Sequence, residues 1–231
     1  IYPAVVIGAM VGIGILMLIV VVPKLAETFN ELGVELPLTT RLVISTGTFL
    51  AERWIIVILF VAVLLFVLRS FLKTQTGKKT FDKLMLKIPI ISAIVKKTNS
   101  AYTARSLGSL FSAGVPIVRA LEIVSRSLGN IYFRTALLDV AEKVGKGSKL
   151  SEALRRHENI YSPIITQMVE VGEETGETSN ILKKLADFFE EEASNSAKNL
   201  SAVIEPALML LVGAVVGFFA VSMIQPMYSM L

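Results

Sequence analysis

The sequence predicts an all-α, polytopic membrane protein with three transmembrane helices and a cytoplasmic bundle of six helices. Three observations support this prediction. The 231 residues are 53% hydrophobic and only 18% charged, and their mean hydropathy of +0.66 is well above that of an ordinary soluble domain. Three long runs contain no charged residue. Between the second and the third run, apolar residues recur at helical rather than alternating spacing.

The first element is the uncharged run of residues 1–22. It is long enough to cross a hydrocarbon core, which needs about 20 helical residues, so we expect it to form the first transmembrane helix. Neither a basic segment nor an initiating Met precedes it, which is unlike a signal peptide. We therefore expect the chain to be a fragment of a longer protein.

The second and third runs predict two further transmembrane helices. Residues 54–68 lie between Arg53 and Arg69 and are short for a span, so the flanking residues must contribute while the arginines extend toward the surface. We place this second helix at 54–72. The third run, Pro206–Ile224, has no charge, and we place the third transmembrane helix with a short outer tail at 203–231.

The charges between the runs predict the orientation in the membrane. Residues 23–53 carry three basic and four acidic side chains, whereas Arg69–Lys87 carries six basic side chains and one acid. The positive-inside rule then places 23–53 in a short extracytoplasmic loop and 73–202 in the cytoplasm.

The cytoplasmic segment is long enough to fold around its own core. Breaks containing Gly, Pro or Asn divide it into six helices, and Pro116 and Pro163 are placed at helix starts. The breaks fall at 113–116, 129–130, 145–147, 161–163 and 176. Apolar stripes predict the buried faces and comprise Ile117, Ala120, Leu121, Val124 and Leu128; Phe133, Leu137, Val140, Ala141 and Val144; Ile165, Met168 and Val169; and Ile181, Leu185, Phe188 and Phe189.

The first and third membrane runs are related by a constant offset of 203 residues. The offset pairs Ile1 with Ile204, Pro3 with Pro206, Ala4 with Ala207, Gly14 with Gly217 and Pro23 with Pro226. Prolines in the same register are hard to obtain by chance in two membrane helices, so we interpret the match as an internal duplication. A duplication predicts a second copy of the bundle, N-terminal to residue 1 and missing from this chain.

The composition lacks most of the side chains that catalytic and metal-binding sites require. There is no Cys, which excludes a disulfide scaffold, a Cys-based zinc site, an iron–sulfur cluster and a thiol nucleophile. The single histidine, His157, is too few for a HExxH zinc helix or a di-iron bundle. The balance of 23 basic and 19 acidic residues is too even to indicate nucleic-acid binding. We expect no enzyme activity and no cofactor.

One string resembles the end of a phosphate-binding loop. Val144–Ser148 reads Val-Gly-Lys-Gly-Ser, but a Walker A motif requires a Gly where residue 140 is Val. The string also follows a predicted helix rather than a strand, so we interpret it as a flexible turn between two helices. Energy for any mechanical work must then come from a partner.

Four short stretches carry a resemblance to a known family. They are Leu-Pro-Leu-Thr-Thr at 36–40, Ser-Ala-Gly-Val-Pro-Ile at 112–117, Gly-Glu-Glu-Thr-Gly at 172–176 and Ile-Glu-Pro at 204–206. With the predicted layout, these stretches make the chain resemble the type II secretion F and type IV pilus C family of inner-membrane platform proteins. The resemblance covers essentially the whole chain, and it implies an all-helical cytoplasmic domain that occurs twice in the full protein.

The resemblance also implies a function. A platform of this family couples a hexameric cytoplasmic assembly ATPase to the extraction and assembly of pilin or pseudopilin subunits, together with other inner-membrane components. Whether the machine is a secretion system or a pilus, and whether the platform is a homo-oligomer, stays open. The alternative is a polytopic membrane transporter, which is disfavoured because no predicted span carries a charge at mid-depth.

Candidate contact or structural residues follow from the same stretches. Gly114 and Pro116 lie at a predicted helix start. Glutamates cluster around Gly172 and Gly176 at helical spacings, and this cluster comprises Glu170, Glu173, Glu174 and Glu177. Three interpretations of the cluster are open: a turn held in a particular shape, a contact with a basic partner, or a site for a hard cation.

Two further sets lie at or in the membrane. Glu205 precedes Pro206, so its carboxylate either complements the dipole of the first turn of the last span or couples the bundle to that span. Small residues at GxxxG spacing predict helix–helix packing, and they are Gly8 with Gly12 and Gly213 with Gly217.

Basic residues at Lys96–Lys97 and Arg155–His157 are interpreted as solvated faces, or alternatively as contacts with an acidic partner or the anionic leaflet.

Overall fold

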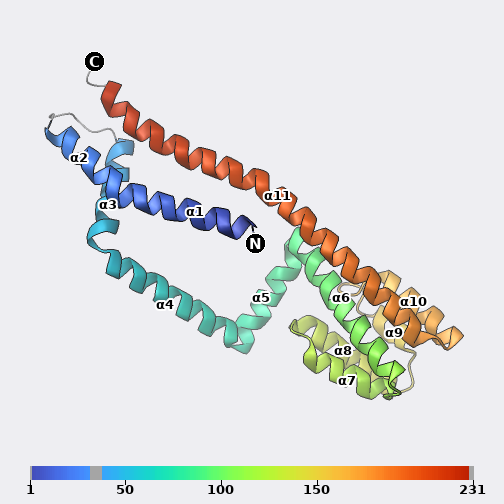
Figure 1. Cartoon of the computed structure of the whole chain (residues 1–231). Helices are drawn as coiled ribbons and strands as arrows, with labels where there is room; N and C mark the ends of the chain where they lie inside the picture. Colours follow the sequence, from blue (N-terminus) through green and yellow to red (C-terminus); the bar gives the residue numbers. More distant parts are fainter. Residues whose placement is uncertain (1, 32–37, 229–231) are drawn as a thin grey trace. The chain divides into compact units, whose positions relative to one another are not determined.

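The computed structural model describes residues 2–31 and 38–228, and within them every regular element is helical (Figure 1). The all-α prediction is confirmed. The chain divides into two compact units, which we call the membrane unit, residues 1–68 with 201–231, and the bundle unit, residues 69–200. Part of the 36–40 stretch and the ends of the chain lie outside the described residues.

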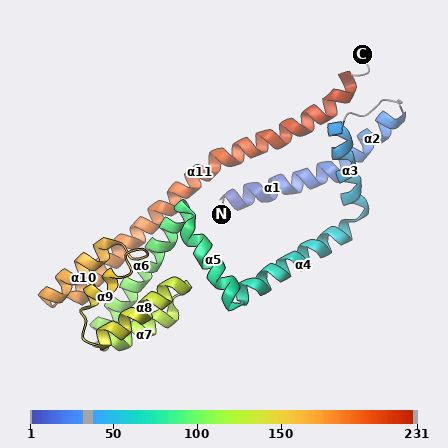
Figure 2. The same cartoon turned by 180° about the vertical axis from the view of Figure 1, so that it is seen from behind.

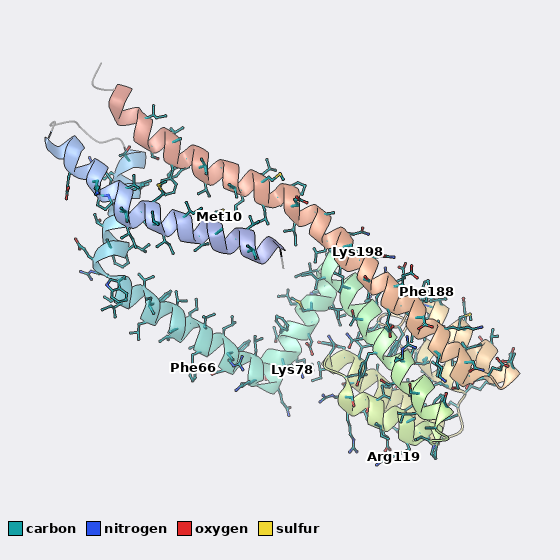
Figure 3. All side chains as sticks on the ribbon, in the orientation of Figure 1. Met10, Phe66, Lys78, Arg119, Phe188 and Lys198 are labelled. Carbon is teal, nitrogen blue, oxygen red and sulfur yellow. The ribbon has the colours of Figure 1, made fainter. Side chains whose placement is uncertain are left out.

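Three described helices are long and apolar enough to cross a membrane, as predicted. The apolar stretches are Val5–Lys24, Trp54–Lys73 and the C-terminal part of Thr178–Ser222. The first combines α1 (Tyr2–Leu16) with the π-helical segment η1 (Met17–Val21), the second is α4 (Trp54–Lys73), and the third belongs to α11 (Thr178–Tyr228). Figure 3 shows apolar side chains such as Phe66 projecting freely from α4, as expected where lipid replaces a protein core.

A proline determines the irregular helix at the end of the first span. Pro23 has no N–H to donate and its ring would collide with the carbonyl four residues earlier in a regular α-helix. The chain widens there into η1, where Val22 donates its N–H to the Met17 carbonyl oxygen, five residues back. The helix α2 (Val22–Glu31) then continues in α-helical form.

The segment expected as an extracytoplasmic loop is itself largely helical. It contains most of α2 and the helix α3 (Leu38–Glu52). Gly47 of α3 lies directly against η1, because a Cβ at this position would be 2.5 Å from the Leu18 carbonyl oxygen. The buried Thr40 hydroxyl donates a hydrogen bond to the Ser222 carbonyl oxygen at 2.6 Å. These contacts join α3 to η1 and to α11 within the membrane unit.

The bundle unit comprises the end of α4, six complete helices and the first part of α11; Figures 1 and 2 show these helices from opposite sides. One break between them was not predicted: Pro89 is the first residue of a new helix, with Ile88 in extended conformation before it. The complete helices are α5 (Gln75–Lys87), α6 (Pro89–Ser112), α7 (Ile117–Ser127), α8 (Ile131–Gly145), α9 (Leu150–Arg155) and α10 (Pro163–Thr175).

The predicted stripes form one core, with two corrections. Leu121, Leu137 and Val169 are fully buried, together with most of the other stripe residues. Ile117, the first residue of α7, and Phe188, however, are each 44% exposed. The core also contains Tyr161, whose ring meets Phe133 edge-on at 5.1 Å; burial raises the pKa of this phenol.

The last helix differs from the prediction. We expected a new helix to open at Pro206, but α11 runs without interruption from Thr178 to Tyr228. Glu205 therefore lies in the interior of a helix, where no free N-terminal amides are available, and its expected contact with a helix dipole is wrong.

Two helices of the bundle end in the same hydrogen-bonded motif. At the end of α6, Gly114 adopts φ +76°, and Val115 donates its N–H to the Leu110 carbonyl oxygen. At the end of α8, Gly147 adopts φ +97°, and Ser148 donates its N–H to the Lys143 carbonyl oxygen. A left-handed Gly with this bond from the following residue is the Schellman motif, which satisfies carbonyl groups that a helix end leaves open.

The left-handed conformation at Gly114 predicts a measurable asymmetry between two Gly→Ala variants. Gly114→Ala should destabilise the bundle by about 1–2 kcal/mol, because a Cβ disfavours positive φ. Gly145→Ala should stabilise it by about 0.5 kcal/mol, since its Cβ would meet only Val118 at 3.9 Å. Thermal unfolding of the detergent-solubilised chain, followed by circular dichroism, measures both. Equal effects of the two variants on stability would contradict the left-handed conformation at Gly114.

Candidate functional site

The Gly-Glu-Glu-Thr-Gly stretch closes α10 and packs it against the start of α11. Gly172 is buried, and a Cβ there would be 2.9 Å from the Thr178 Cα atom, so only Gly permits this approach. Gly176 adopts φ +74° and ends α10 in the left-handed conformation. Both glycines therefore have a structural role, which favours the first of the three interpretations for this part of the cluster.

Glu173 binds the beginning of another helix. Its Oε1 accepts a hydrogen bond from the Leu150 N–H at 2.6 Å, and its Oε2 accepts bonds from the Ser151 N–H at 3.1 Å and the Ser151 hydroxyl at 2.5 Å. The N-cap residue of α9, Lys149, provides no side-chain acceptor. A carboxylate from α10 thus takes the role that a local Ser or Asp fills in most helices.

The remaining glutamates of the cluster are separate from this cap. Glu170 forms an ion pair with Arg155 of α9 at 2.7 Å, whereas Glu174 and Glu177 are exposed. Among the described residues, no group of three acidic or histidine side chains is arranged to hold a metal ion. The cluster is therefore divided between internal contacts and an exposed acidic pair, Glu174 with Glu177.

A second carboxylate caps a helix in the same way, and no local sequence motif indicates it. Asp82 of α5 is buried and accepts a hydrogen bond from the Ile131 N–H, the first residue of α8, at 2.8 Å. Asn130 caps the same helix locally through the Tyr132 N–H at 3.0 Å. Asp82 and Glu173 lie 49 and 23 residues away from the amides they bind, so neither cap is visible as a local sequence motif.

The string that resembles a phosphate loop is a helix end. Gly147 donates its N–H to the Val144 carbonyl oxygen at 3.0 Å, within the Schellman motif of α8. Lys146 pairs with Glu142 at 2.5 Å, and this hydrogen bond raises the pKa of the lysine. Because the amides are engaged with carbonyl groups of the same turn, they do not form a cradle for phosphate.

Several of the basic residues predicted as solvated faces form ion pairs within the bundle. Lys97 of α6 contacts Glu192 of α11 at 2.7 Å. Arg155 contacts Glu170, and His157 Nε2 lies 2.7 Å from an Asp139 oxygen. Two further ion pairs that the sequence did not suggest join Arg105 of α6 to Asp187 and Glu190 of α11, at 2.5 and 2.9 Å.

Asp139 is the centre of a small charge network on α8. Its carboxylate is hydrogen-bonded to Lys143, one helical turn later, and to His157 after α9. The Lys143 hydrogen bond, followed by that of His157, lowers the pKa of Asp139 from its usual value of 3.8. This network joins the turn after α9 to α8.

A groove on the bundle surface lies between α6, the turn before α10, and α11. Its volume is about 480 Å³, and it is lined by both apolar and charged side chains. The exposed Phe188, labelled in Figure 3, lies on the α11 side, and Lys96 and Glu158 lie on the other sides. The exposure of Phe188 thus gives the bundle a mixed apolar and charged surface.

The membrane glycines have no close neighbour within the described chain. A Cβ at Gly8, Gly12, Gly213 or Gly217 would meet nothing within 4 Å. The predicted helix–helix packing at these residues therefore stays a prediction, for contacts with other chains.

Nearby, α1, η1 and α11 form an apolar groove of about 540 Å³ whose lining includes Met10, Gly14 and Val216.

The described chain is all-helical, with three helices long and apolar enough to cross a membrane, and this architecture defines the class of helical proteins of membrane type. The sequence model of the family described as Type II secretion system (T2SS), protein F, matches residues 103–226, more than half of the chain. The chain belongs to this family, which confirms the resemblance drawn from its sequence.

Three curated relatives are similar over the whole chain. The type IV pilus assembly protein PilC of Pseudomonas aeruginosa is 35% identical over 230 residues, which cover 99% of this chain and 61% of the relative. PilC of Thermus thermophilus is 33% identical, with coverages of 100% and 57%. The type II secretion system protein F of Aeromonas hydrophila is 30% identical, with coverages of 100% and 59%. The chain thus spans less than two thirds of the length of these relatives.

The cap that Glu173 provides for α9 predicts that this residue contributes more to the stability of the bundle than Glu174, its neighbour in the same stretch. Glu173→Ala should destabilise the bundle by about 1–3 kcal/mol, because the amides of Leu150 and Ser151 lose their acceptors. Glu173→Gln should retain part of this stability through its remaining oxygen. Glu174→Gln, the matched control, should stay within about 0.5 kcal/mol of the wild type. Thermal unfolding measures all three, and a neutral Glu173→Ala would contradict the cap.

The lowered pKa of Asp139 predicts a pH-dependent stability. Because the folded-state pKa lies below 3.8, the contribution is fully present above pH 3.8 and is lost as the pH falls through the lower folded value. Asp139→Asn should therefore lower the unfolding temperature at neutral pH, and the difference from wild type should vanish in strong acid. A difference that is constant across the acid range would show that the charge of Asp139 contributes nothing.

Proposed function

We propose that this protein is a non-enzymatic inner-membrane platform of a type IV pilus or type II secretion machine. In this role it couples a cytoplasmic assembly ATPase to the extraction and assembly of pilin or pseudopilin subunits. The observation that carries the proposal is the family match over residues 103–226, which includes most of the bundle and the last apolar helix. The names of the relatives, which include both pilus assembly and secretion proteins, support it.

The arrangement of the bundle supports a mechanical rather than a chemical role. Three carboxylates that are not fully exposed, those of Asp82, Glu173 and Asp139, are engaged in helix caps and an ion pair. The bundle is thus a packed body that carries force but has no energy source of its own. A partner ATPase would supply the work, with residues 73–202 in the cytoplasm.

Helix α11 provides the proposed route for coupling. It is a single helix of 51 residues that contributes to the core of the bundle through Leu182 and Phe189 and continues into the last apolar stretch. A displacement imposed on the bundle would be transmitted along its backbone hydrogen bonds. The apolar groove beside Gly14 and Val216 would then accommodate an apolar helix of a pilin-like subunit.

The proposed contact with the motor is the exposed acidic pair, Glu174 with Glu177. Glu170 and Glu173 are engaged internally, so these two carboxylates are the part of the cluster that a basic partner surface can reach. A transporter function is not favoured, because the relatives are named for pilus assembly and secretion.

Reversing the acidic pair tests the proposed contact. Glu174→Lys with Glu177→Lys should weaken binding of the assembly ATPase by about tenfold or more, because like charges would then face each other. The same variant should reduce pilus or pseudopilus assembly in cells. Binding is measured with the natural, detergent-solubilised protein and the ATPase from the same organism.

The matched control is Glu158→Lys with Glu191→Lys, which makes the same change of charge at other exposed glutamates of the bundle. It should bind the ATPase as the wild type does. If the Glu174 and Glu177 variant also binds normally, the acidic pair is not the contact. If the wild type itself binds no assembly ATPase, the platform function is wrong.

A further inference from the structure

Helix α5 combines a strongly basic sequence with direct attachment to a membrane-type helix. Only Thr74 separates it from the end of α4 at Lys73. The segment Arg69–Lys87 contains six basic residues and one acid, Asp82. Because one residue extends the chain by less than about 4 Å, the first turn of α5 must lie close to the end of that apolar helix.

The inward face of α5 contains the acid. Asp82 is buried and bound to the N–H of Ile131, and Leu86 packs against the core of the bundle. The only negative charge of the segment is therefore withdrawn from the surface, and the charged side chains that α5 exposes are all basic.

The exposed side of α5 carries both apolar and basic side chains. Phe81 is 43% exposed and Leu84 is 51% exposed, and their spacing of three residues places them on one face of the helix. Lys87 is exposed three residues after Leu84, on the same side of the helix, whereas Lys83 and Lys79 are exposed further round the helix, away from Phe81. Lys78, labelled in Figure 3, lies on the other side.

The junction between α4 and α5 is locally fixed. The Thr74 hydroxyl donates a hydrogen bond to the Phe71 carbonyl oxygen at 2.7 Å and accepts one from the Gly77 N–H at 3.0 Å. A Cβ at Gly77 would be 2.0 Å from the same Phe71 oxygen, so only Gly allows this turn. The start of α5 is therefore held against the last turn of α4 rather than linked to it by a flexible segment.

We propose that α5 binds the headgroup region of an anionic phospholipid bilayer. Phe81 and Leu84 enter the boundary between headgroups and acyl chains, Lys87 beside Leu84 contacts lipid phosphates, and Lys79 and Lys83 add positive charge that attracts the anionic surface. A helix with an aromatic and aliphatic strip flanked by lysines is suited to this position, and anionic lipid attracts basic residues next to a membrane span. The proposal goes beyond the platform function and does not depend on it.

Fluorescence quenching in vesicles tests the position of α5. The only tryptophan, Trp54, is replaced in a common Trp54→Phe background, and Phe81→Trp or Leu84→Trp introduces a reporter in the full chain. Each variant is reconstituted in phosphatidylcholine vesicles with and without phosphatidylglycerol, with bromine atoms on the acyl chains as quenchers. Both reporters should be quenched in the anionic vesicles. Adding Lys79→Gln, Lys83→Gln and Lys87→Gln should reduce the quenching to about one third or less.

Two controls make the result specific. Leu138→Trp places the reporter at another exposed position of the bundle, on α8, and should not be quenched. Arg126→Gln, Lys149→Gln and Lys184→Gln remove the same charge from other exposed positions and should leave the Phe81→Trp signal unchanged.

Reporters that stay unquenched in anionic vesicles would overturn the proposal and favour an acidic protein surface as the partner. Equal quenching in both lipids, unaffected by the α5 lysine changes, would overturn the recognition of anionic lipid.

Discussion

The bundle depends on carboxylates that one helix supplies to the free amides at the start of another. Helix α9 has only six residues and no acceptor on its N-cap side chain, and so short a helix is unstable in isolation. Glu173 of α10 supplies the missing acceptor. Asp82 of α5 does the same for α8. Because each bond joins distant parts of the chain, it fixes a helix and its position together, and the core formed around Leu121, Leu137 and Val169 can then close.

Much of the fold could be predicted, because periodicity and helix-breaking residues are local signals. The buried positions Leu121 and Val140 follow from helical spacing, and Gly114 and Gly176 end helices because only Gly adopts their backbone conformation easily. Three features could not be predicted in this way. The role of Glu173 depends on a residue 23 positions away. Pro206 is accommodated inside α11, where a local rule expects a helix start. The exposure of Phe188 follows from which helices pack against α11, which its own spacing does not determine.

The candidate site was predicted less well than the fold, because the same residue types serve structure and recognition. The Gly-Glu-Glu-Thr-Gly stretch resembles a contact motif, yet Gly172, Glu173 and Gly176 are needed to pack α10, α9 and α11 together. What remains available to a partner is the exposed pair Glu174 with Glu177, and the basic outward face of α5. In the proposed platform function, the packed core of the bundle would carry force and the exposed charges would bind partners.

The most direct test of the platform function is co-purification of the natural, detergent-solubilised protein from its own cells, with mass spectrometry of the proteins that stay bound. The account predicts recovery of an assembly ATPase together with pilin-like subunits, and the identity of these subunits would show which machine the protein serves. Recovery of neither, with substrate-dependent ion flux in vesicles that contain the purified protein, would contradict it.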